Sequence, residues 1–166
     1  MKKAVIIILS VLALLNALFI YHNSSQTRVD SRKISKGLSS QIVEITDKSY
    51  ADKEYAQQMK TVYKTETQLR RYAHVIEFAT LAFLLCLIGL IAPTRAGWMT
   101  LFTAVAYLVS IGYGFLDEWH QIFVDGRAFS RNDIVSDTFG CTIGMILAVL
   151  VYSVYLIIKR NKKGVA

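Results

Sequence analysis

Four long apolar blocks dominate this chain and limit what it can fold into. They are Ala4–Tyr21, Tyr72–Ala92, Trp98–Leu116 and Asp137–Ile158. Roughly 20 mostly apolar residues are needed to cross a ~30 Å hydrocarbon core as an α-helix, and each block has about that length. A soluble domain would instead disperse its apolar residues at the periods of a half-buried strand or helix. The sequence therefore predicts an all-α fold, a polytopic membrane helical bundle of four transmembrane helices.

The same pattern divides the chain into four parts. We expect an N-terminal membrane anchor helix at residues 1–21 and an extracytoplasmic, amphipathic helical arm at residues 22–71. A three-helix membrane core follows at residues 72–158, and a basic cytoplasmic tail at residues 159–166. An anchor is favoured over a cleaved signal peptide, because the first apolar run is long and lacks a convincing small-x-small cleavage site.

Basic residues predict which side of the membrane each part faces. Short cytoplasmic loops are enriched in Lys and Arg. Segments 1–3, 93–97 and 159–166 contain no acidic residue, and they carry Lys2, Lys3, Arg95, Lys159, Arg160, Lys162 and Lys163. We therefore expect a multi-pass protein of the cell membrane with both termini cytoplasmic. The net charge of +7 is then largely topogenic, so the lipid bilayer is an expected partner and nucleic acid is not.

The external segment 23–71 shows helical spacing of apolar residues in two stretches. Ser49 and Asp52 have the spacing of a capping box, which would start the second helix. No Gly or Pro interrupts the residues that follow, so this helix is expected to continue into the second span. Glu66 and Arg70 fit a solvated helix face. An arm resting on the membrane surface or on the bundle is expected, with partner binding as the alternative.

Ionisable and amide side chains gather where three of the predicted spans meet the outer side. Such groups at a membrane boundary cost free energy unless they are paired or hydrated, so they form a candidate cluster for function. The topology brings the start of the second span, the end of the third and the start of the fourth to one side. The catalytic candidates are His74, Glu77, Asp117, Glu118, His120 and Gln121, and the ligand-binding candidates are Arg127, Arg131, Asp133 and Asp137.

Several of these candidates also have a structural explanation. Ser130 and Asp133 have the spacing of a capping box for the fourth helix. Asp137 lies a full turn deeper than a cap requires and therefore needs a partner, such as Arg127 or Arg131. Arg127 itself is aimed either at these acids or at a ligand anion.

Glycines and cysteines of the same region predict packing and turns. Gly126 would supply a turn with positive φ. Gly140 and Gly144 lie on one stripe and would allow a second helix backbone to approach closely. Cys86 and Cys141 fall within apolar spans and are expected to be packing residues.

Three kinds of chemistry fit the candidate cluster. It could be a hydrogen-bonded structural network, or an acid–base site in which His74 or His120 works with a carboxylate. A divalent metal held by His74, Glu77, Asp117 and His120 is the third alternative, although their spacing matches no defined metal motif. The residues identify neither a cofactor nor a metal.

Two sequence elements also carry a family resemblance. One contains Arg71, His74, Glu77 and Phe78, and the other contains Asp117, Glu118, Gln121, Gly126, Arg127, Ser130, Asp133, Asp137, Gly140 and Gly144. Together they resemble the VanZ-like family over roughly residues 70–144, so the core 72–158 is its VanZ-like part. The resemblance implies an integral membrane protein of a bacterial envelope. The family is named after a member associated with low-level resistance to the glycopeptide teicoplanin.

The resemblance and the candidate cluster lead to one functional expectation with two mechanisms. We expect a protein that acts at the outer face of the cytoplasmic membrane on or with an envelope component and contributes to glycopeptide (teicoplanin) resistance. Its ligand would be a lipid-linked envelope precursor or a glycopeptide-related molecule. An enzyme would hold phosphate with Arg127 or Arg131 and move protons with a His–carboxylate pair. The alternative is a non-enzymatic binding or assembly module whose cluster is structural. Transport is disfavoured, because the charges do not form a chain through the spans.

The residues of the candidate region divide into those expected to serve stability and those expected to serve activity. Caps and packing glycines have complete structural explanations, so Ser130, Gly140 and Gly144 are expected to matter more for stability. A crowded set of acids has no such explanation. The residues expected to matter more for activity than for folding are Asp117, Glu118, His120, Gln121 and Arg127.

Overall fold

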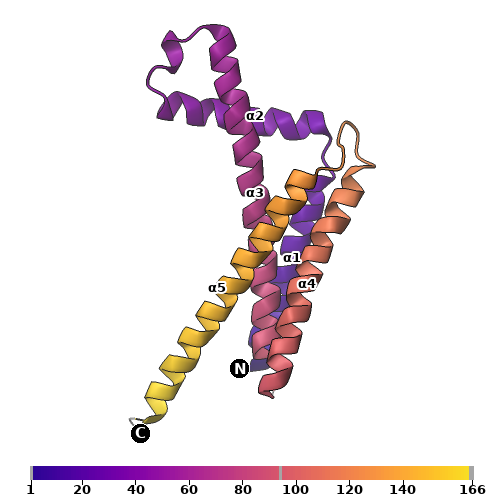
Figure 1. Cartoon of the computed structure of the whole chain (residues 1–166), viewed down its shortest axis with the longest axis vertical. Helices are drawn as coiled ribbons and strands as arrows, with labels where there is room; N and C mark the ends of the chain where they lie inside the picture. The colour runs from indigo at the N-terminus through magenta and orange to yellow at the C-terminus, as the bar shows by residue number, and fades with distance from the viewer. Residues whose placement is uncertain (1, 94, 165–166) are drawn as a thin grey trace.

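The computed structural model describes residues 2–93 and 95–164, and within them every regular element is a helix. The elements are α1 (Lys2–Ser24), α2 (Arg28–Thr46), the 3-10 helix η1 (Tyr50–Asp52), α3 (Tyr55–Ile91), α4 (Ala96–Gln121) and α5 (Arg131–Gly164). Helices α1, α3, α4 and α5 form a bundle, and α2 lies across the N-terminal part of α3 (Figure 1). The expected all-α fold is confirmed.

Four of the described helices are long and apolar enough to span a membrane. They are Lys2–Ser24, Tyr55–Ile91, Gly97–Gln121 and Arg131–Lys162. Most of their large apolar side chains, among them Leu14, Phe115 and Ile157, face outward. Contiguous apolar surface of this extent is unfavourable in water and favourable in lipid. The chain is therefore a multi-pass membrane protein.

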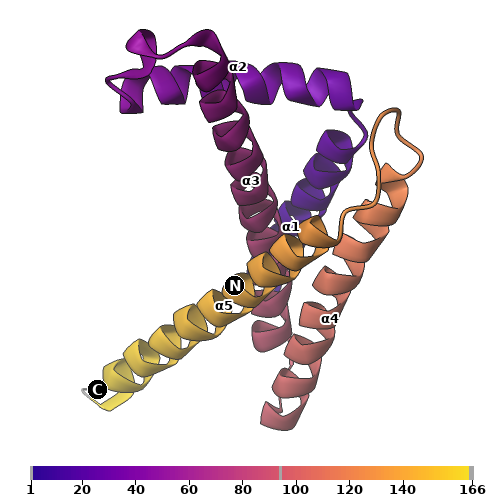
Figure 2. The same ribbon diagram turned by 45° about the horizontal axis from the view of Figure 1, so that its top comes forward.

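Helix α3 is much longer than a membrane crossing requires. Its 37 residues correspond to about 55 Å at the rise of an α-helix, against a ~30 Å hydrocarbon core. It runs without a break from segment 23–71 into the bundle, so the expected continuation into the second span is confirmed. The part of α3 that extends beyond the bundle carries α2 (Figure 2).

An ion pair with one buried partner holds α2 onto this extension. Glu66 of α3 is buried, and its Oε1 accepts hydrogen bonds from Arg32 Nε at 3.3 Å and Ser35 Oγ at 3.2 Å. Ser39 and Val43 of α2 are also buried. The expected pairing of Glu66 with Arg70 on a solvated face is wrong, because α2 folds back and covers that face of α3.

The capping box predicted at Ser49 is also wrong. Ser49 precedes η1, makes no side-chain cap, and donates its hydroxyl to Asp47 Oδ1 at 2.8 Å. Helix α3 begins at Tyr55, after Glu54 as N-cap residue. Asp47 accepts a second hydrogen bond from Lys53, and these donors lower the pKa of its carboxyl below the ordinary value. The turn between α2 and α3 is therefore organised around Asp47.

Helices α3 and α5 pack backbone against backbone, as the glycine stripe predicts. A Cβ atom placed on Gly140 would collide with the carbonyl oxygen of Val75, and one on Gly144 with that of Ala79. Cys141, next to Gly140, is fully buried in the core with Phe78, Leu81 and Ala82, and Cys86 is buried too. The predicted packing roles of these glycines and cysteines are confirmed. They fix the register between α3 and α5, which positions the polar residues described next.

Candidate functional site

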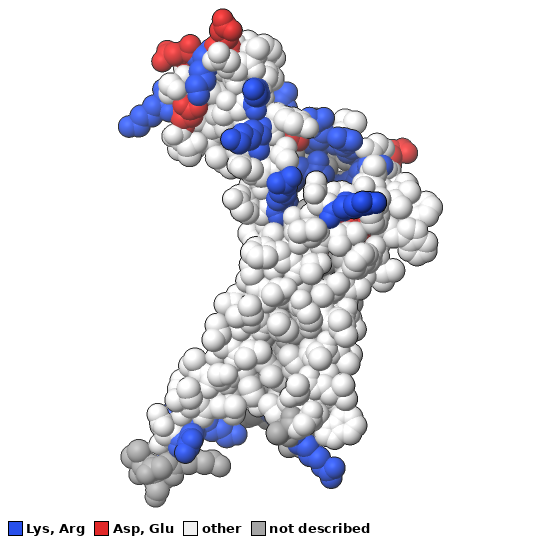
Figure 3. Space-filling model, in the orientation of Figure 1, with Lys and Arg blue, Asp and Glu red and all other residues white. Residues whose placement is uncertain are grey.

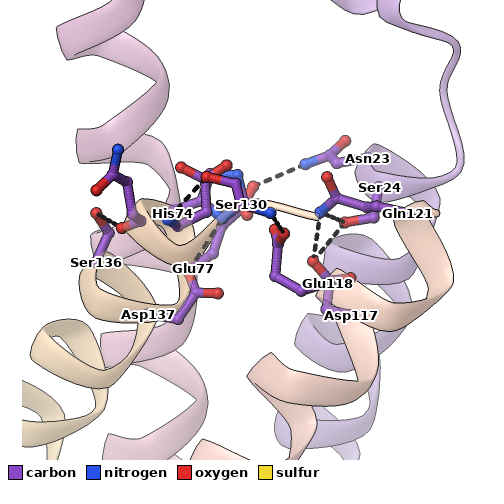
Figure 4. Close-up of polar contacts among 12 residues, drawn as sticks. Asn23, Ser24, His74, Glu77, Asp117, Glu118, Gln121, Ser130, Ser136 and Asp137 are labelled. Atoms are coloured by element: carbon purple, nitrogen blue, oxygen red, sulfur yellow. Dashed lines mark hydrogen bonds and ion pairs between the residues drawn. The ribbon is translucent and has the colours of Figure 1, made fainter. Parts of the chain in front are cut away.

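Polar side chains from four helices meet at the end of the bundle where α1 and α4 end and α5 begins (Figure 4). We call this set the inner cluster. It consists of Asn23 and Ser24 of α1, His74 and Glu77 of α3, Asp117, Glu118 and Gln121 of α4, and Asp137 of α5. Six of these eight residues were predicted as site residues; the two from α1 were not.

Asp137 pairs with His74. Nδ1 of His74 lies 3.0 Å from Oδ1 of Asp137, and both side chains are largely shielded from solvent. The expected arginine partner of Asp137 is therefore wrong. The close packing of α5 on α3 turns Asp137 toward His74, whereas Arg131 is the first residue of α5 and Arg127 precedes that helix. Within the described part of the chain, Oδ2 of Asp137 has no hydrogen-bond partner.

Two neighbouring residues at the end of α1 connect α3 with α4. Asn23 Nδ2 donates to Glu77 Oε1 at 2.8 Å, and Ser24 Oγ donates to Asp117 Oδ2 at 2.8 Å. Gln121 Nε2 donates to the same Asp117 oxygen at 2.9 Å. The two acids are therefore satisfied by neutral donors. The signal that could have identified Asn23 and Ser24 is their place at the C-terminal end of an otherwise apolar span.

Glu118 joins the end of α4 to the start of α5. Its fully buried side chain accepts the backbone N–H of Ser130 with Oε2 at 2.7 Å, while Oε1 has no partner among the described residues. Ser130 Oγ in turn accepts the N–H of Asp133 at 3.2 Å, as a helix N-cap does. In a complete capping box the Asp133 side chain would accept the Ser130 N–H. Glu118 takes that position instead.

Arg127 holds the connection between α1 and α2. Its guanidinium donates to the carbonyl oxygens of Gln26 at 2.9 Å and Asn23 at 3.1 Å, and to Gln121 Oε1 at 3.1 Å. The turn before it has the predicted positive φ, 72° at Gly126. Burial lowers the pKa of the Arg127 guanidinium, and the nearby charge of Arg70 lowers that pKa further. Arg127 thus binds neutral acceptors directly, with the charges of Arg70, Asp117, Glu118 and Asp133 nearby.

His120 lies outside the inner cluster. Its ring stacks on Tyr21 with a centroid distance of 4.8 Å, and its Nε2 lies 3.1 Å from Ser25 Oγ. The four-residue metal site considered from the sequence is therefore not assembled. Within residues 2–93 and 95–164, no group of three or more His, Cys, Asp or Glu side chains has an arrangement that could hold a metal ion.

Arginines surround a cavity beside the inner cluster. The cavity has a volume of about 590 Å³, within the range of ligand-binding pockets. Six arginines line it, which is why we call it the arginine cavity: Arg28, Arg32, Arg70, Arg71, Arg127 and Arg131. The acids in its lining are Glu66, already paired with Arg32, and Asp133. Figure 3 shows the basic side chains gathered at this end of the molecule, below the arm.

The geometry brings together most, but not all, of the predicted candidates. His74, Gln121, Arg127, Arg131 and Asp133 line the arginine cavity. Glu77, Asp117, Glu118 and Asp137 of the inner cluster do not line it, and neither does His120. Two features escaped sequence reasoning: the polar end of α1, and the arginines that α2 adds by folding over α3.

Four membrane-length helices with a buried polar cluster at one end of the bundle define the class of the chain, a multi-pass membrane protein. Residues 5–152 match the sequence model of the VanZ/LLP1 family, so the chain belongs to that family. No curated protein and no solved structure matches the chain. The family match extends beyond the two elements of residues 70–144 and includes α1 and α2. Asn23, Ser24 and the arginines of α2 therefore lie within the family region.

Proposed function

We propose that this protein binds a phosphate-bearing component of the bacterial envelope at the outer face of the cytoplasmic membrane, in the arginine cavity. The observation that carries the proposal is unpaired positive charge. Arg70, Arg71 and Arg131 line the cavity and make no hydrogen bond or ion pair with any residue that the structure describes. A guanidinium matches the geometry of a phosphate and binds it through paired, charge-assisted hydrogen bonds.

The balance of charged residues around the cavity supports the same proposal. Six arginines line it, and the charge of Arg70 lowers the pKa of Arg127, although burial lowers that pKa more and Asp117, Glu118 and Asp133 raise it. Asp133 is the cavity acid that remains without an ion pair among the described residues. Positive charge therefore exceeds negative charge around the cavity. An anion with two negative charges, such as a phosphate monoester, would relieve this excess.

The proposed orientation places the arginine cavity outside and both termini inside. Both ends of the chain and the α3–α4 turn lie at the opposite end of the bundle (Figure 1). Lys2 Nζ donates to the carbonyl oxygen of Pro93 at 3.5 Å, which joins the N-terminus to that turn. The segments at this end are rich in Lys and Arg and have no acidic residue, as short cytoplasmic segments do.

A binding role is favoured because the inner cluster is largely closed on itself. Glu77 and Asp117 accept from neutral donors, and Glu118 accepts a backbone N–H. Acids held in this way fix the helices and leave the arginines to bind the ligand. One observation favours catalysis as a second candidate. His74 lines the cavity and contacts Asp137, and such a pair can accept and return a proton.

We propose that the envelope ligand is a lipid-linked precursor or a lipid headgroup, and that its binding contributes to teicoplanin resistance. A protein that binds such a component at the outer face would change how much of that component a glycopeptide can reach there. Membership of the VanZ/LLP1 family supports this role.

A matched pair of charge variants tests the binding proposal. Arg70→Gln/Arg71→Gln removes two cavity arginines, whereas Lys60→Gln/Lys64→Gln removes two exposed charges from the same helix outside the cavity. The probe is dioleoyl phosphatidic acid, titrated into the purified protein and followed by native mass spectrometry. We expect at least tenfold weaker binding for the arginine variant and a change below twofold for the lysine variant. Equal effects of the two variants, or no effect of either, would overturn the proposal.

Two further measurements separate binding from catalysis and connect the site to resistance. His74→Gln should retain binding of the probe. If the wild-type protein changes the probe chemically and His74→Gln alone does not, the catalytic candidate is supported. In cells, Arg70→Gln/Arg71→Gln at normal protein abundance should lower teicoplanin resistance, while the lysine variant should not.

A further inference from the structure

A second cavity adjoins the arginine cavity beneath α2. Its volume is about 350 Å³. Arg70, His74 and Arg127 line both cavities, so these three side chains form the boundary between them. A ligand that reaches this boundary from one cavity therefore meets the other.

The lining of the second cavity is more apolar than that of the arginine cavity, and we call its apolar part the apolar wall. Phe19 of α1, Ile34 and Leu38 of α2, and Leu69 and Ala73 of α3 contribute to it. Ile34 is 59% exposed and Leu38 49% exposed, and both line this cavity together with residues of α1 and α3. These side chains form an apolar surface that no described residue covers.

The wall continues onto the membrane-facing surface of α1. Phe19 belongs to a membrane span and is 55% exposed, so the cavity reaches surface that lipid covers. Helix α2 lies across the N-terminal part of α3 (Figures 1 and 2). Its Ile34 and Leu38 line the cavity, whereas Ser39 and Val43 are buried and do not line it. A hydrocarbon chain could therefore enter the second cavity from the bilayer along Phe19, while Glu77, Arg70 and Arg127 supply the charged part of the lining.

We infer that the two cavities are halves of one site for a phosphate-bearing lipid, with the phosphate among the arginines and a hydrocarbon chain beneath α2. The inference rests on the proposed function, because it assigns the phosphate to the same arginines. It goes further in requiring that the ligand be an amphiphile rather than a water-soluble phosphate. Charged and apolar surfaces that share a boundary match such a molecule, in which head and chain are joined.

The test uses two probes that share a headgroup and differ in chain length. Dioleoyl phosphatidic acid carries long chains, and dibutyryl phosphatidic acid is a short-chain form. Leu38→Asn places a polar group in the wall of the second cavity. Ile45→Asn is the matched control, because Ile45 lies on the same helix, is 80% exposed and lines neither cavity.

We expect Leu38→Asn to weaken binding of the long-chain probe at least fivefold and to leave the short-chain probe within twofold of wild type. Ile45→Asn should change neither. Because Leu38 is half exposed, its substitution should not unfold the protein, and Leu38→Met should restore long-chain binding. That rescue separates loss of the apolar wall from loss of structure.

The arginine variant separates failure of this inference from failure of the proposed function. Suppose that Arg70→Gln/Arg71→Gln weakens binding of both probes. If Leu38→Asn then weakens binding of neither probe, or of both probes equally, the phosphate site stands and the chain site is wrong. If the arginine variant affects neither probe, the phosphate site is wrong and the inference falls with it.

Discussion

Replacing Gly144 with alanine should force α3 and α5 apart. The added Cβ would collide with the carbonyl oxygen of Ala79 and lie 2.8 Å from the amide nitrogen of Phe83, and neither backbone atom can move without its helix. Overpacking of this kind costs about 1–3 kcal/mol. Gly112 of α4 has nothing within 4 Å of an added Cβ, so Gly112→Ala is the matched control. Any gain in helix propensity is common to both, so the two variants should differ by about 1–3 kcal/mol in the free energy of unfolding.

The two native cysteines provide the assay. Cys86 and Cys141 are free and buried, and they lie on the two helices that Gly144 brings together. A thiol-reactive fluorogenic dye should therefore report their exposure as the detergent-purified protein is heated. We expect Gly144→Ala to expose the thiols at a lower temperature than wild type, by about 2–4 °C for each kcal/mol. If Gly144→Ala and Gly112→Ala exposed them at the same temperature, the close approach would not be what holds α3 on α5.

Further substitutions test the α4–α5 and α1–α2 connections, with the same assay or with proteolysis. Ser130→Ala removes an N-cap acceptor and should lower stability by about 1 kcal/mol; an unchanged unfolding temperature would contradict this role. Glu118→Gln keeps an acceptor for the Ser130 N–H and removes a buried charge, so the free energy of unfolding should hold or rise. Glu118→Ala removes the acceptor and should lower that free energy by about 1–3 kcal/mol. Equal losses in the two variants would show that the hydrogen bond is unimportant. Arg127→Lys cannot reach all three acceptors of the guanidinium, so protease should cleave the α1–α2 connection several-fold faster than in wild type. Arg131→Lys should leave that cleavage rate unchanged.

The membrane helices could be predicted from the sequence because apolar length is a local property. The glycine stripe was equally readable, since Gly140 and Gly144 lie one turn apart and nothing but close packing accounts for both. The position of α2 could not be predicted in the same way. Its apolar and polar residues fit a helix on the membrane as well as one on the bundle. The contact that decides between them, Arg32 with Glu66, joins residues far apart in sequence.

The site was predicted in outline and missed in its pairings. The topology placed His74 and Asp137 on the same side, but spacing within one helix does not identify neighbours on another. Asp137 was therefore assigned to arginines at the start of its own helix, although the packing glycines turn it toward α3. Asn23 was missed for a related reason. Its importance lies in reaching Glu77 across the bundle rather than in any motif around it.

The pattern of pairing also changes which residues should carry function. The sequence favoured Asp117, Gln121 and Arg127 as working groups, because no local contact explained them. In the structure Asp117 and Gln121 are hydrogen-bonded to each other, and Arg127 fixes the α1–α2 connection by way of Gln121 and two carbonyl oxygens. Groups that are fully engaged in this way stabilise the fold and shape the cavity wall. A ligand requires groups that are still available, and Arg70 and Arg71 remain unpaired among the described residues while lining the cavity. Their removal should therefore reduce binding without lowering the unfolding temperature, whereas loss of Arg127 should reduce both.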